Sequence, residues 1–391
     1  MGKRIAKEVS IAIAEAVKQC RVDVIAAYPI TPQSHIVEHL SELVANGELD
    51  AEYVTVESEH SAISACLGAV ATGARTFTST SAQGLALMHE ILFITSAMRL
   101  PVVMVVANRA LSAPISIWND HGDIMAERDI GWIQTFAENG QEAVDLLYHA
   151  FRVAEDRRVM FPAIVNIDGF NLSHMIEPIE LPDQELVDKY IPPFKPKYKL
   201  DPRKPISIGP VGIPEIYMEV KKAQDEAFKN AYKVIIKAWQ EFEEIFGRRY
   251  QPVESYRMED AEVALLIMGS LAETAMTAVD KMREAGKKVG LLRFRLWRPF
   301  PLRDFLKAVK GVKLLAVIDR AISIGATGGP VGTEVRSALY QVTGRPRIVN
   351  FIAGLGGRDV TVEDFEEMTD KAYFYLKKKP KEPYEMIGVK E

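Results

Sequence analysis

The sequence has very little cysteine: among its 391 residues, only Cys20 and Cys66 carry a thiol. Two thiols cannot build a disulfide framework, and they cannot supply the four ligands of an iron–sulfur cluster. Both lie in stretches of helical pattern, where a free cysteine ordinarily acts as a small buried hydrophobic residue. Any iron–sulfur chemistry that involves this chain must therefore use clusters on another chain.

Long hydrophobic runs and dense basic runs are also missing. No apolar stretch approaches the ~20 residues that cross a bilayer, and the amino terminus lacks the pattern of a signal peptide. We therefore expect a cytoplasmic protein with no membrane partner. The formal net charge of -5 at pH 7 gives no basic footprint, so we also expect no nucleic-acid partner.

What the sequence does contain is an alternation of β-rich runs and amphipathic helical patterns. The strand-like runs are residues 22–28, 53–56, 75–80, 101–107 and 163–168, and the helical stretches between them include 33–46, 84–98 and 141–155. This alternation predicts an α/β fold with a doubly wound parallel sheet. A second α/β pattern of the same kind begins near residue 260.

Three segments follow from these patterns. Residues 1–175 form the first α/β domain, residues 176–258 form a connector, and residues 259–391 form the second α/β domain. The connector is rich in proline, so we expect an extended arm without sheet, followed by a long charged helix over about 216–246. In the second domain, Thr361 and Asp364 have the spacing of a helix capping box.

Two motifs occupy the loops where an open α/β sheet places its chemistry, at the carboxyl ends of parallel strands. Ala-Tyr-Pro-Ile-Thr-Pro at 27–32 ends an apolar strand with two prolines around Thr31. Glu-Ser-Glu-His-Ser-Ala at 57–62 places Glu59 at the start of a helix of small residues. Taken singly, Glu59 is a helix-capping acid, and Thr31 is a turn residue whose hydroxyl satisfies backbone.

Together the motifs resemble the 2-oxoacid:ferredoxin oxidoreductases, and within them the alpha subunits of the multi-subunit pyruvate enzymes. The resemblance covers nearly the whole chain. It implies that the first domain binds the pyrimidine half of thiamine diphosphate, with Pro29, Ile30 and Thr31 beside the cofactor. It also implies that Glu59 is the catalytic glutamate that hydrogen-bonds the pyrimidine nitrogen N1' and promotes formation of the ylide nucleophile.

Two further loops carry candidate residues. Arg109 follows a buried-looking strand, and a guanidinium can bind a carboxylate through two parallel hydrogen bonds. The resemblance places the carboxylate of the 2-oxoacid substrate at Arg109, with Thr31 helping to hold the substrate. Gln83 and Gly84 open a helix after the strand at 75–80, a position that suits cofactor contact.

Residues 119–129 form a polar cluster that matches no tight zinc or magnesium site, so we expect loop structure and no metal there. Within it, His121 is interpreted as a hydrogen-bonding residue. Two glycine-rich loops, 324–332 and 354–359, lie in the second domain, and neither has the spacing of a dinucleotide loop. The resemblance is to a transketolase carboxyl-terminal-like domain, which implies mainly a role in assembly.

The chain also lacks the Gly-Asp-Gly and downstream Asn with which thiamine enzymes usually anchor the diphosphate through magnesium. The resemblance therefore implies a beta subunit that carries the diphosphate and magnesium site, and gamma and delta subunits that carry iron–sulfur clusters. The implied reaction is oxidative decarboxylation of pyruvate to acetyl-CoA and CO2. Coenzyme A takes the acyl group, and ferredoxin takes the electrons.

Three alternatives remain open. The same chemistry could act on another 2-oxoacid, such as 2-oxoisovalerate, 2-oxoglutarate, oxalate or an aryl-glyoxylate, although Thr31 and the stretch at 111–115 are pyruvate-like. The chain could be a non-catalytic scaffold, but a scaffold needs none of Thr31, Glu59 and Arg109 in these loops. A transketolase or oxoacid dehydrogenase without an iron–sulfur partner is disfavoured by the missing diphosphate motif.

Overall fold

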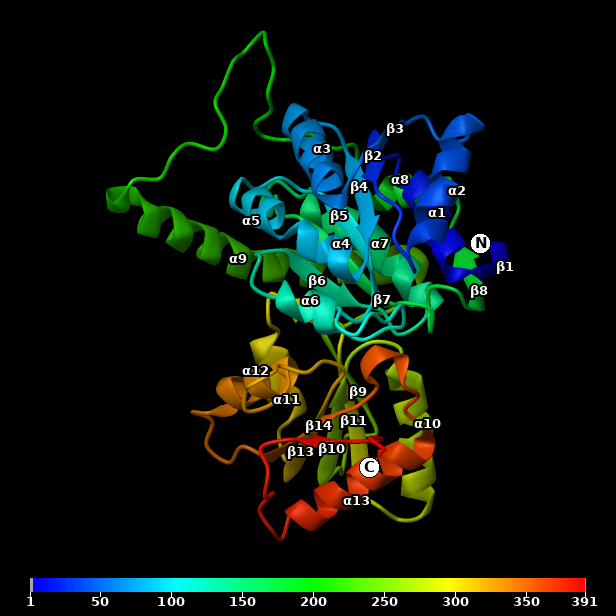
Figure 1. The fold of residues 1–391 in the computed structure, drawn as a ribbon, viewed down its shortest axis with the longest axis vertical. Coiled ribbons are helices and arrows are strands. Elements are labelled where there is room, and N and C mark those ends of the chain that lie inside the picture. The colour runs from blue at the N-terminus through cyan, green and yellow to red at the C-terminus, as the bar shows by residue number, and fades with distance from the viewer. Residues whose placement is uncertain (1–2, 391) are drawn as a thin grey trace.

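The computed structural model describes residues 3–390, which fold around two sheets placed one above the other along the long axis of the molecule (Figure 1). The strands of the first sheet are β2 (Val24–Ala27), β3 (Glu52–Thr55), β4 (Thr76–Thr80), β5 (Val103–Asn108), β6 (Ile133–Phe136), β7 (Ala163–Asp168) and β12 (Leu296–Arg298). Their order is β12-β6-β7-β5-β4-β2-β3, and every pair from β6 to β3 is parallel. The predicted doubly wound sheet is confirmed.

Helices cover both faces of this sheet. They are α1 (Val9–Gln19), α2 (Ser34–Ala45), α3 (Glu59–Thr72), α4 (Ala82–Leu87), α5 (His89–Ala97), α6 (Gly122–Ala126) and α7 (Gly140–Ala154). Helices α1, α2 and α7 contribute to one apolar core, and α3, α4 and α5 to another. Because both faces are covered, β4, β5 and β7 are buried along their whole length.

The segment at 176–258 differs from the predicted connector. Strand β8 (Ile176–Leu181) pairs with β1 (Lys3–Glu8) in a separate antiparallel pair, and α8 (Gln184–Tyr190) follows it. The prediction of a segment without sheet is therefore wrong here. Each strand of a two-stranded pair keeps one free edge, so the missing N–H of Pro178 is tolerated. Residues 191–213 contain no helix or strand and form the green loop that extends from the body in Figure 1.

The predicted long helix is confirmed as α9 (Pro214–Phe246), with 33 residues. It starts with proline at its first position, where the missing N–H is harmless, and ends at Gly247 in the left-handed conformation. Its amino-terminal half projects from the body (Figure 1). Its carboxyl-terminal half buries Ala231, Ile235 and Phe242 in the core that α7 also lines.

The second sheet has the order β15-β14-β13-β10-β11-β9. Its strands are β9 (Val253–Tyr256), β10 (Val263–Ile267), β11 (Val289–Phe294), β13 (Leu314–Asp319), β14 (Arg347–Ile352) and β15 (Glu385–Met386). Its helical elements are α10 (Leu271–Glu284), α11 (Leu302–Ala308), α12 (Pro330–Leu339), the 3-10 turn η1 (Leu355–Gly357) and α13 (Val362–Tyr375). The predicted capping box of Thr361 and Asp364 starts α13. Strand β9 is a further sheet element inside the segment predicted as connector.

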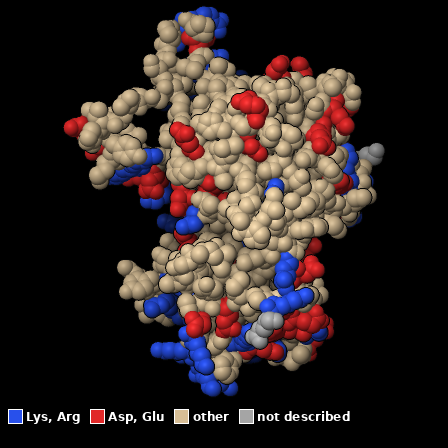
Figure 2. All heavy atoms as spheres, in the orientation of Figure 1, with Lys and Arg blue, Asp and Glu red and all other residues tan. Residues whose placement is uncertain are grey.

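The two halves are joined by more than the chain itself. Strand β12, which follows β11 of the second sheet, pairs antiparallel with β6 at the edge of the first sheet. Charged side chains gather on the second domain, at the bottom of Figure 2, whereas the middle of the first domain's visible face is largely uncharged. Within residues 3–390, no helix is both long and apolar enough to cross a membrane.

Candidate active site

The predicted site residues all lie at one edge of the first sheet. Strands β3, β2, β4 and β5 are neighbours and parallel, so the loops at their carboxyl ends meet at this edge. Pro29, Ile30 and Thr31 lie in the loop after β2, and Arg109 lies in the loop after β5. Glu59 is the first residue of α3, which follows β3, and Gln83 and Gly84 lie in the first turn of α4, which follows β4.

Glu59 is the first residue of α3, but it is not the cap of that helix. The Ser58 hydroxyl oxygen accepts the N–H of Ser61 at 3.2 Å and takes the capping role. Only 7% of Glu59 is exposed, and no described residue donates a hydrogen bond to its carboxylate or forms an ion pair with it. A nearly buried carboxylate without a partner is unfavourable, so this side chain is suited to a donor from outside the chain.

Gly84 allows α4 to lie directly against this carboxylate. A Cβ added at Gly84 would lie 2.6 Å from Oε1 of Glu59, so every other residue type would displace the acid. In the same turn, the hydroxyl oxygens of Thr80 and Ser81 and Oε1 of Gln83 are buried without a hydrogen-bond partner. This set of unpartnered polar atoms beside an acid fits an aminopyrimidine ring, which has both donors and acceptors.

Arg109 is buried, with 6% exposure, and two carbonyl oxygens hold its guanidinium. Nε donates to the Ser116 carbonyl and Nη1 donates to the Thr31 carbonyl, both at 3.0 Å. Nη2 has no partner among the described residues, so its N–H groups are free to bind a carboxylate. Burial lowers the pKa of Arg109, although arginine stays protonated in proteins.

The structure thus brings Thr31 and Arg109 together, but through the backbone of Thr31. Thr31 is exposed, and none of the described residues forms a hydrogen bond with its hydroxyl. Gln83 links the neighbouring loops because its Nε2 donates to the hydroxyl of Ser112 at 2.8 Å. The loop of the cofactor candidates and the loop of the substrate candidates are therefore in direct contact.

Asp123 is a residue of the site that sequence reasoning missed. Its Oδ2 accepts the backbone N–H groups of Ala82 and Arg109, each at 3.0 Å, and its Oδ1 accepts Nδ2 of Asn108 at 3.0 Å. Burial raises the pKa of Asp123 to about 6, against the effect of these hydrogen bonds. The carboxylate fixes the loops after β4 and β5 relative to each other. The polar cluster at 119–129 was its only signal in the sequence.

His121 is a hydrogen-bonding residue, as predicted. Its Nε2 lies 2.8 Å from Oδ1 of Asp168, at the end of β7. Oδ2 of Asp168 accepts Nη1 of Arg320 at 2.9 Å and the N–H of Ser270 at 2.8 Å, and both donors come from the second domain. Arg320 and His121 hold the pKa of Asp168 well below its usual range, against the effect of burial. This carboxylate joins the two domains beside the site.

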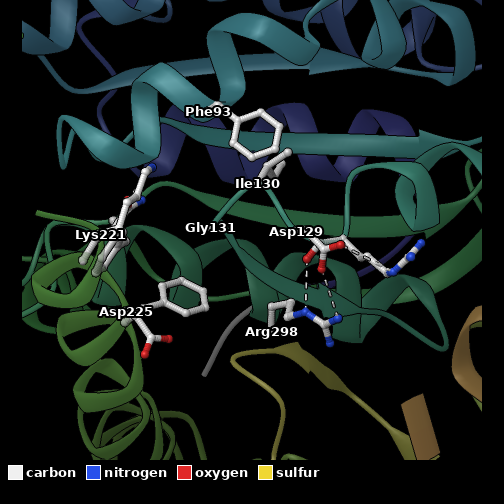
Figure 3. A pocket seen from close by; sticks show the side chains of 11 residues that line it. Phe93, Asp129, Ile130, Gly131, Lys221, Asp225 and Arg298 are labelled. Atoms are coloured by element: carbon white, nitrogen blue, oxygen red, sulfur yellow. Dashed lines mark hydrogen bonds and ion pairs between the residues drawn. The ribbon is translucent and has the colours of Figure 1, made fainter. Parts of the chain in front are cut away.

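Two other features of the described residues lie outside this site. A pocket of about 340 Å³ is lined by Phe93, Asp129, Arg298 and residues of α9, with an Asp129–Arg298 ion pair at 3.8 Å (Figure 3). No predicted site residue lines it. Glu8, His35 and His174 bring potential metal-ligand atoms within 4.8 Å of one another. A Glu8–His35 hydrogen bond of 2.7 Å accounts for that contact, and we assign no metal to it.

Family models identify both domains. Residues 15–240 match the model of the pyruvate flavodoxin/ferredoxin oxidoreductase thiamine diphosphate-binding domain. The chain belongs to the pyruvate flavodoxin/ferredoxin oxidoreductase family. Residues 261–365 match core domain II of pyruvate:ferredoxin oxidoreductase. The resemblance seen in the motifs is confirmed, and the first domain of this family member is its thiamine diphosphate-binding domain.

Relatives within the family are similar over nearly the full length. The pyruvate synthase subunit PorA of Pyrococcus abyssi is 50% identical over 100% of this chain and 99% of its own length. PorA of Methanocaldococcus jannaschii is also 50% identical, over 97% of this chain and 96% of its own. The ketoisovalerate oxidoreductase subunit VorA of P. abyssi is 47% identical, over 94% and 93%.

Solved structures show the same fold at low sequence identity. A 2-oxoglutarate:ferredoxin oxidoreductase from Magnetococcus marinus superposes with a TM-score of 0.72 at 18% identity, over 95% of this chain and 65% of that chain. A split-gene transketolase gives a TM-score of 0.58 at 12% identity, over 94% and 98%. At these identities the likeness concerns the fold, and it confirms the predicted transketolase-like architecture of this family member.

Proposed function

We propose that this chain is the alpha subunit of a cytoplasmic pyruvate:ferredoxin oxidoreductase, which converts pyruvate and coenzyme A to acetyl-CoA and CO2. One observation carries the proposal. Glu59, whose carboxylate has no hydrogen-bond partner among the described residues, and Arg109, whose Nη2 has none, are both buried at one edge of the first sheet. The domain that contains this sheet matches a thiamine diphosphate-binding model. The relatives named pyruvate synthase subunit PorA, at 47% to 51% identity, support pyruvate as the substrate.

Glu59 is the residue that would hold the pyrimidine ring. Its carboxylate would share a proton with a ring nitrogen, and this charge-assisted hydrogen bond would be strong because Glu59 is nearly buried. Pro29, Ile30, Gln83 and Gly84 would surround the same ring, with Gly84 leaving room for the acid. Bound thiamine diphosphate would supply the nucleophile and the stabilisation of carbanion character.

Arg109 would bind the carboxylate of the 2-oxoacid. Its two bonds to carbonyl oxygens fix the plane of the guanidinium, so Nη2 is already oriented when the substrate arrives. The hydroxyl of Thr31 would also contact the 2-oxoacid and help to hold it. Orientation of this kind places the keto carbon near the nucleophile without any covalent role for the arginine.

The partners proposed for this chain follow from what it lacks. A beta subunit would supply the diphosphate and magnesium half of the site, because this sequence has no Gly-Asp-Gly motif. Gamma and delta subunits would carry the iron–sulfur clusters that pass electrons to ferredoxin, because two cysteines cannot ligate a cluster. A 2-oxoisovalerate enzyme is the second candidate, favoured by the 47% identity to the VorA subunit.

The test is Glu59→Gln in the assembled enzyme. Glutamine keeps the shape but cannot take up the proton, so pyruvate-dependent ferredoxin reduction should fall by about 10²- to 10⁴-fold. Co-purification of the subunits should be unchanged. Glu57→Gln is the matched control, because Glu57 is an exposed acid two residues away. Near-normal turnover of the Glu59→Gln enzyme would refute the proposal, and a higher kcat/KM for 2-oxoisovalerate than for pyruvate would select the second candidate.

A further inference from the structure

The glycine-rich turn after β14, residues 354–357, contacts the loop that holds Arg109. The N–H of Gly357 donates to the carbonyl of Asn119 at 2.6 Å, and the N–H of Gly356 donates to Oδ2 of Asp120 at 3.1 Å. Both acceptors are buried residues of the first domain. The turn therefore forms hydrogen bonds across the domain boundary to two polar groups in the loop that follows β5.

That loop carries one of the two carbonyl groups that orient Arg109. It closes on itself, because the N–H of Ala110 donates to the carbonyl of Trp118 at 3.0 Å. Inside this closed segment, the Ser116 carbonyl accepts Nε of Arg109 at 3.0 Å. A Cβ added at Gly356 would lie 3.5 Å from the hydroxyl of Ser116. The second domain thus packs directly against the segment that positions the guanidinium.

Only glycine allows this approach at position 357. Its φ is +76°, and an added Cβ would overlap the Cβ of Trp118 and lie 3.1 Å from Cγ of that side chain. The turn itself is held in place, because the carbonyl of Gly354 accepts Nε of Arg320 at 3.2 Å. Arg320 in turn donates to Asp168 of the first domain. The position of the turn is therefore fixed from both domains.

We propose that this turn of the second domain is a positioning element for the substrate-binding arginine. It fixes the backbone from Ser116 to Asp120, and through the Ser116 carbonyl it fixes the guanidinium of Arg109 in the orientation that receives a carboxylate. This inference rests on the proposed role of Arg109. It gives the second domain a part in substrate binding, beyond the assembly role expected from the sequence.

The test uses two glycine variants of the assembled enzyme. Gly357→Ala combines a strained φ with an overlap on Trp118, so it displaces the loop. Gly344→Ala is the matched control in the same domain, with a φ of +71° and nothing within 4 Å of the added Cβ. We expect the KM for pyruvate to rise about tenfold or more in Gly357→Ala, with a smaller change in kcat, because a charge-assisted contact is misaligned. Gly344→Ala should keep the normal KM.

Tryptophan fluorescence of the full chain gives a readout that does not depend on turnover. Trp118 is 50% exposed, whereas Trp132, Trp239 and Trp297 are buried, so acrylamide quenches mainly Trp118. Quenching should increase in Gly357→Ala and stay unchanged in Gly344→Ala. The strain of alanine at a positive φ is common to both variants, so a change confined to Gly357→Ala comes from the overlap with Trp118.

Arg109→Lys in the same assay tests the carboxylate-binding role of Arg109 separately from the positioning role of the turn. A raised KM in Arg109→Lys and in Gly357→Ala, with the control unchanged, supports the positioning role. A raised KM in Arg109→Lys alone overturns this role and leaves the proposed function intact. A normal KM in Arg109→Lys overturns the carboxylate-binding role of Arg109, and with it the inference about the turn.

Discussion

Replacing Asp123 with asparagine tests how the site is held together, and the structure gives the magnitude. Asparagine keeps the shape, but an amide nitrogen in place of Oδ2 would face the N–H groups of Ala82 and Arg109. Each buried donor left without an acceptor costs about 1–3 kcal/mol. The loss is therefore about 2–6 kcal/mol, before the charge of the carboxylate is considered.

The charge acts in the opposite direction, and its effect depends on pH. Burial raises the pKa of Asp123 from 3.8 to about 6, which corresponds to about 3 kcal/mol at 1.36 kcal/mol per pKa unit. The folded state binds the carboxyl proton of Asp123 more tightly than the unfolded state does, so protonation of Asp123 stabilises the fold. This contribution to the free energy of unfolding is fully present below pH 3.8 and is lost as the pH rises through 6. At pH 7, Asp123→Asn escapes this cost, so its net effect ranges from about 1 kcal/mol of stabilisation to about 3 kcal/mol of destabilisation.

The assay is urea-induced unfolding of the wild-type chain and the variant at pH 7 and pH 4.5. The destabilisation caused by Asp123→Asn should be about 2 kcal/mol larger at pH 4.5 than at pH 7. At pH 4.5 Asp123 is protonated in the folded wild type, so most of the cost of burying its charge is removed. Asparagine does not titrate, and all other groups cancel in the difference. A destabilisation that is equal at the two pH values would refute the view of Asp123 as a buried, charged junction.

Two further predictions concern stability. The pKa of His149 is lowered from 6.5 to about 3 by burial, so the stability that depends on its neutral form is present above pH 6.5 and falls in acid. His149→Phe should therefore lose about 2 kcal/mol less than the wild type between pH 7 and pH 5, measured by urea unfolding at both values. Asp168→Asn should destabilise the chain by about 3–5 kcal/mol, because it leaves Arg320 buried and unpaired.

The parts of the fold that could be predicted are those specified by a pattern of neighbouring residues in the sequence. Strands β4, β5 and β7 are buried along their length, and buried parallel strands read as continuous apolar or small-residue runs. Strand β12 could not be found this way, since it has three residues and its partner β6 lies far away in the sequence. Strand β8 was not predicted because it begins a proline-rich segment, and its partner β1 lies far away in the sequence. It tolerates Pro178 because each strand of a two-stranded pair has one free edge.

The candidate site divides in the same way. Glu59, Gly84 and Arg109 could be brought together from sequence because consecutive parallel strands place their carboxyl ends at one edge. The contact between Gly356 and Asp120 joins residues 236 positions apart, and no local pattern encodes such a pairing. The function of Asp123 was hidden for a related reason, since its role depends on donors from two other loops.

The way in which Arg109 is held supports its proposed role in binding the substrate carboxylate. Elsewhere in this chain, buried arginines are paired with acids, as Arg75 is with Glu155 and Arg320 with Asp168. Arg109 is bound by two neutral carbonyl oxygens, and no described carboxylate forms an ion pair with its guanidinium. Asp123 lies close but accepts the backbone N–H of Arg109, not its side chain. The Asp123 carboxylate attracts the guanidinium through space but does not hydrogen-bond it. Nη2 is therefore fixed in direction and has no hydrogen-bonded carboxylate among the described residues, so a carboxylate from outside the chain can bind there.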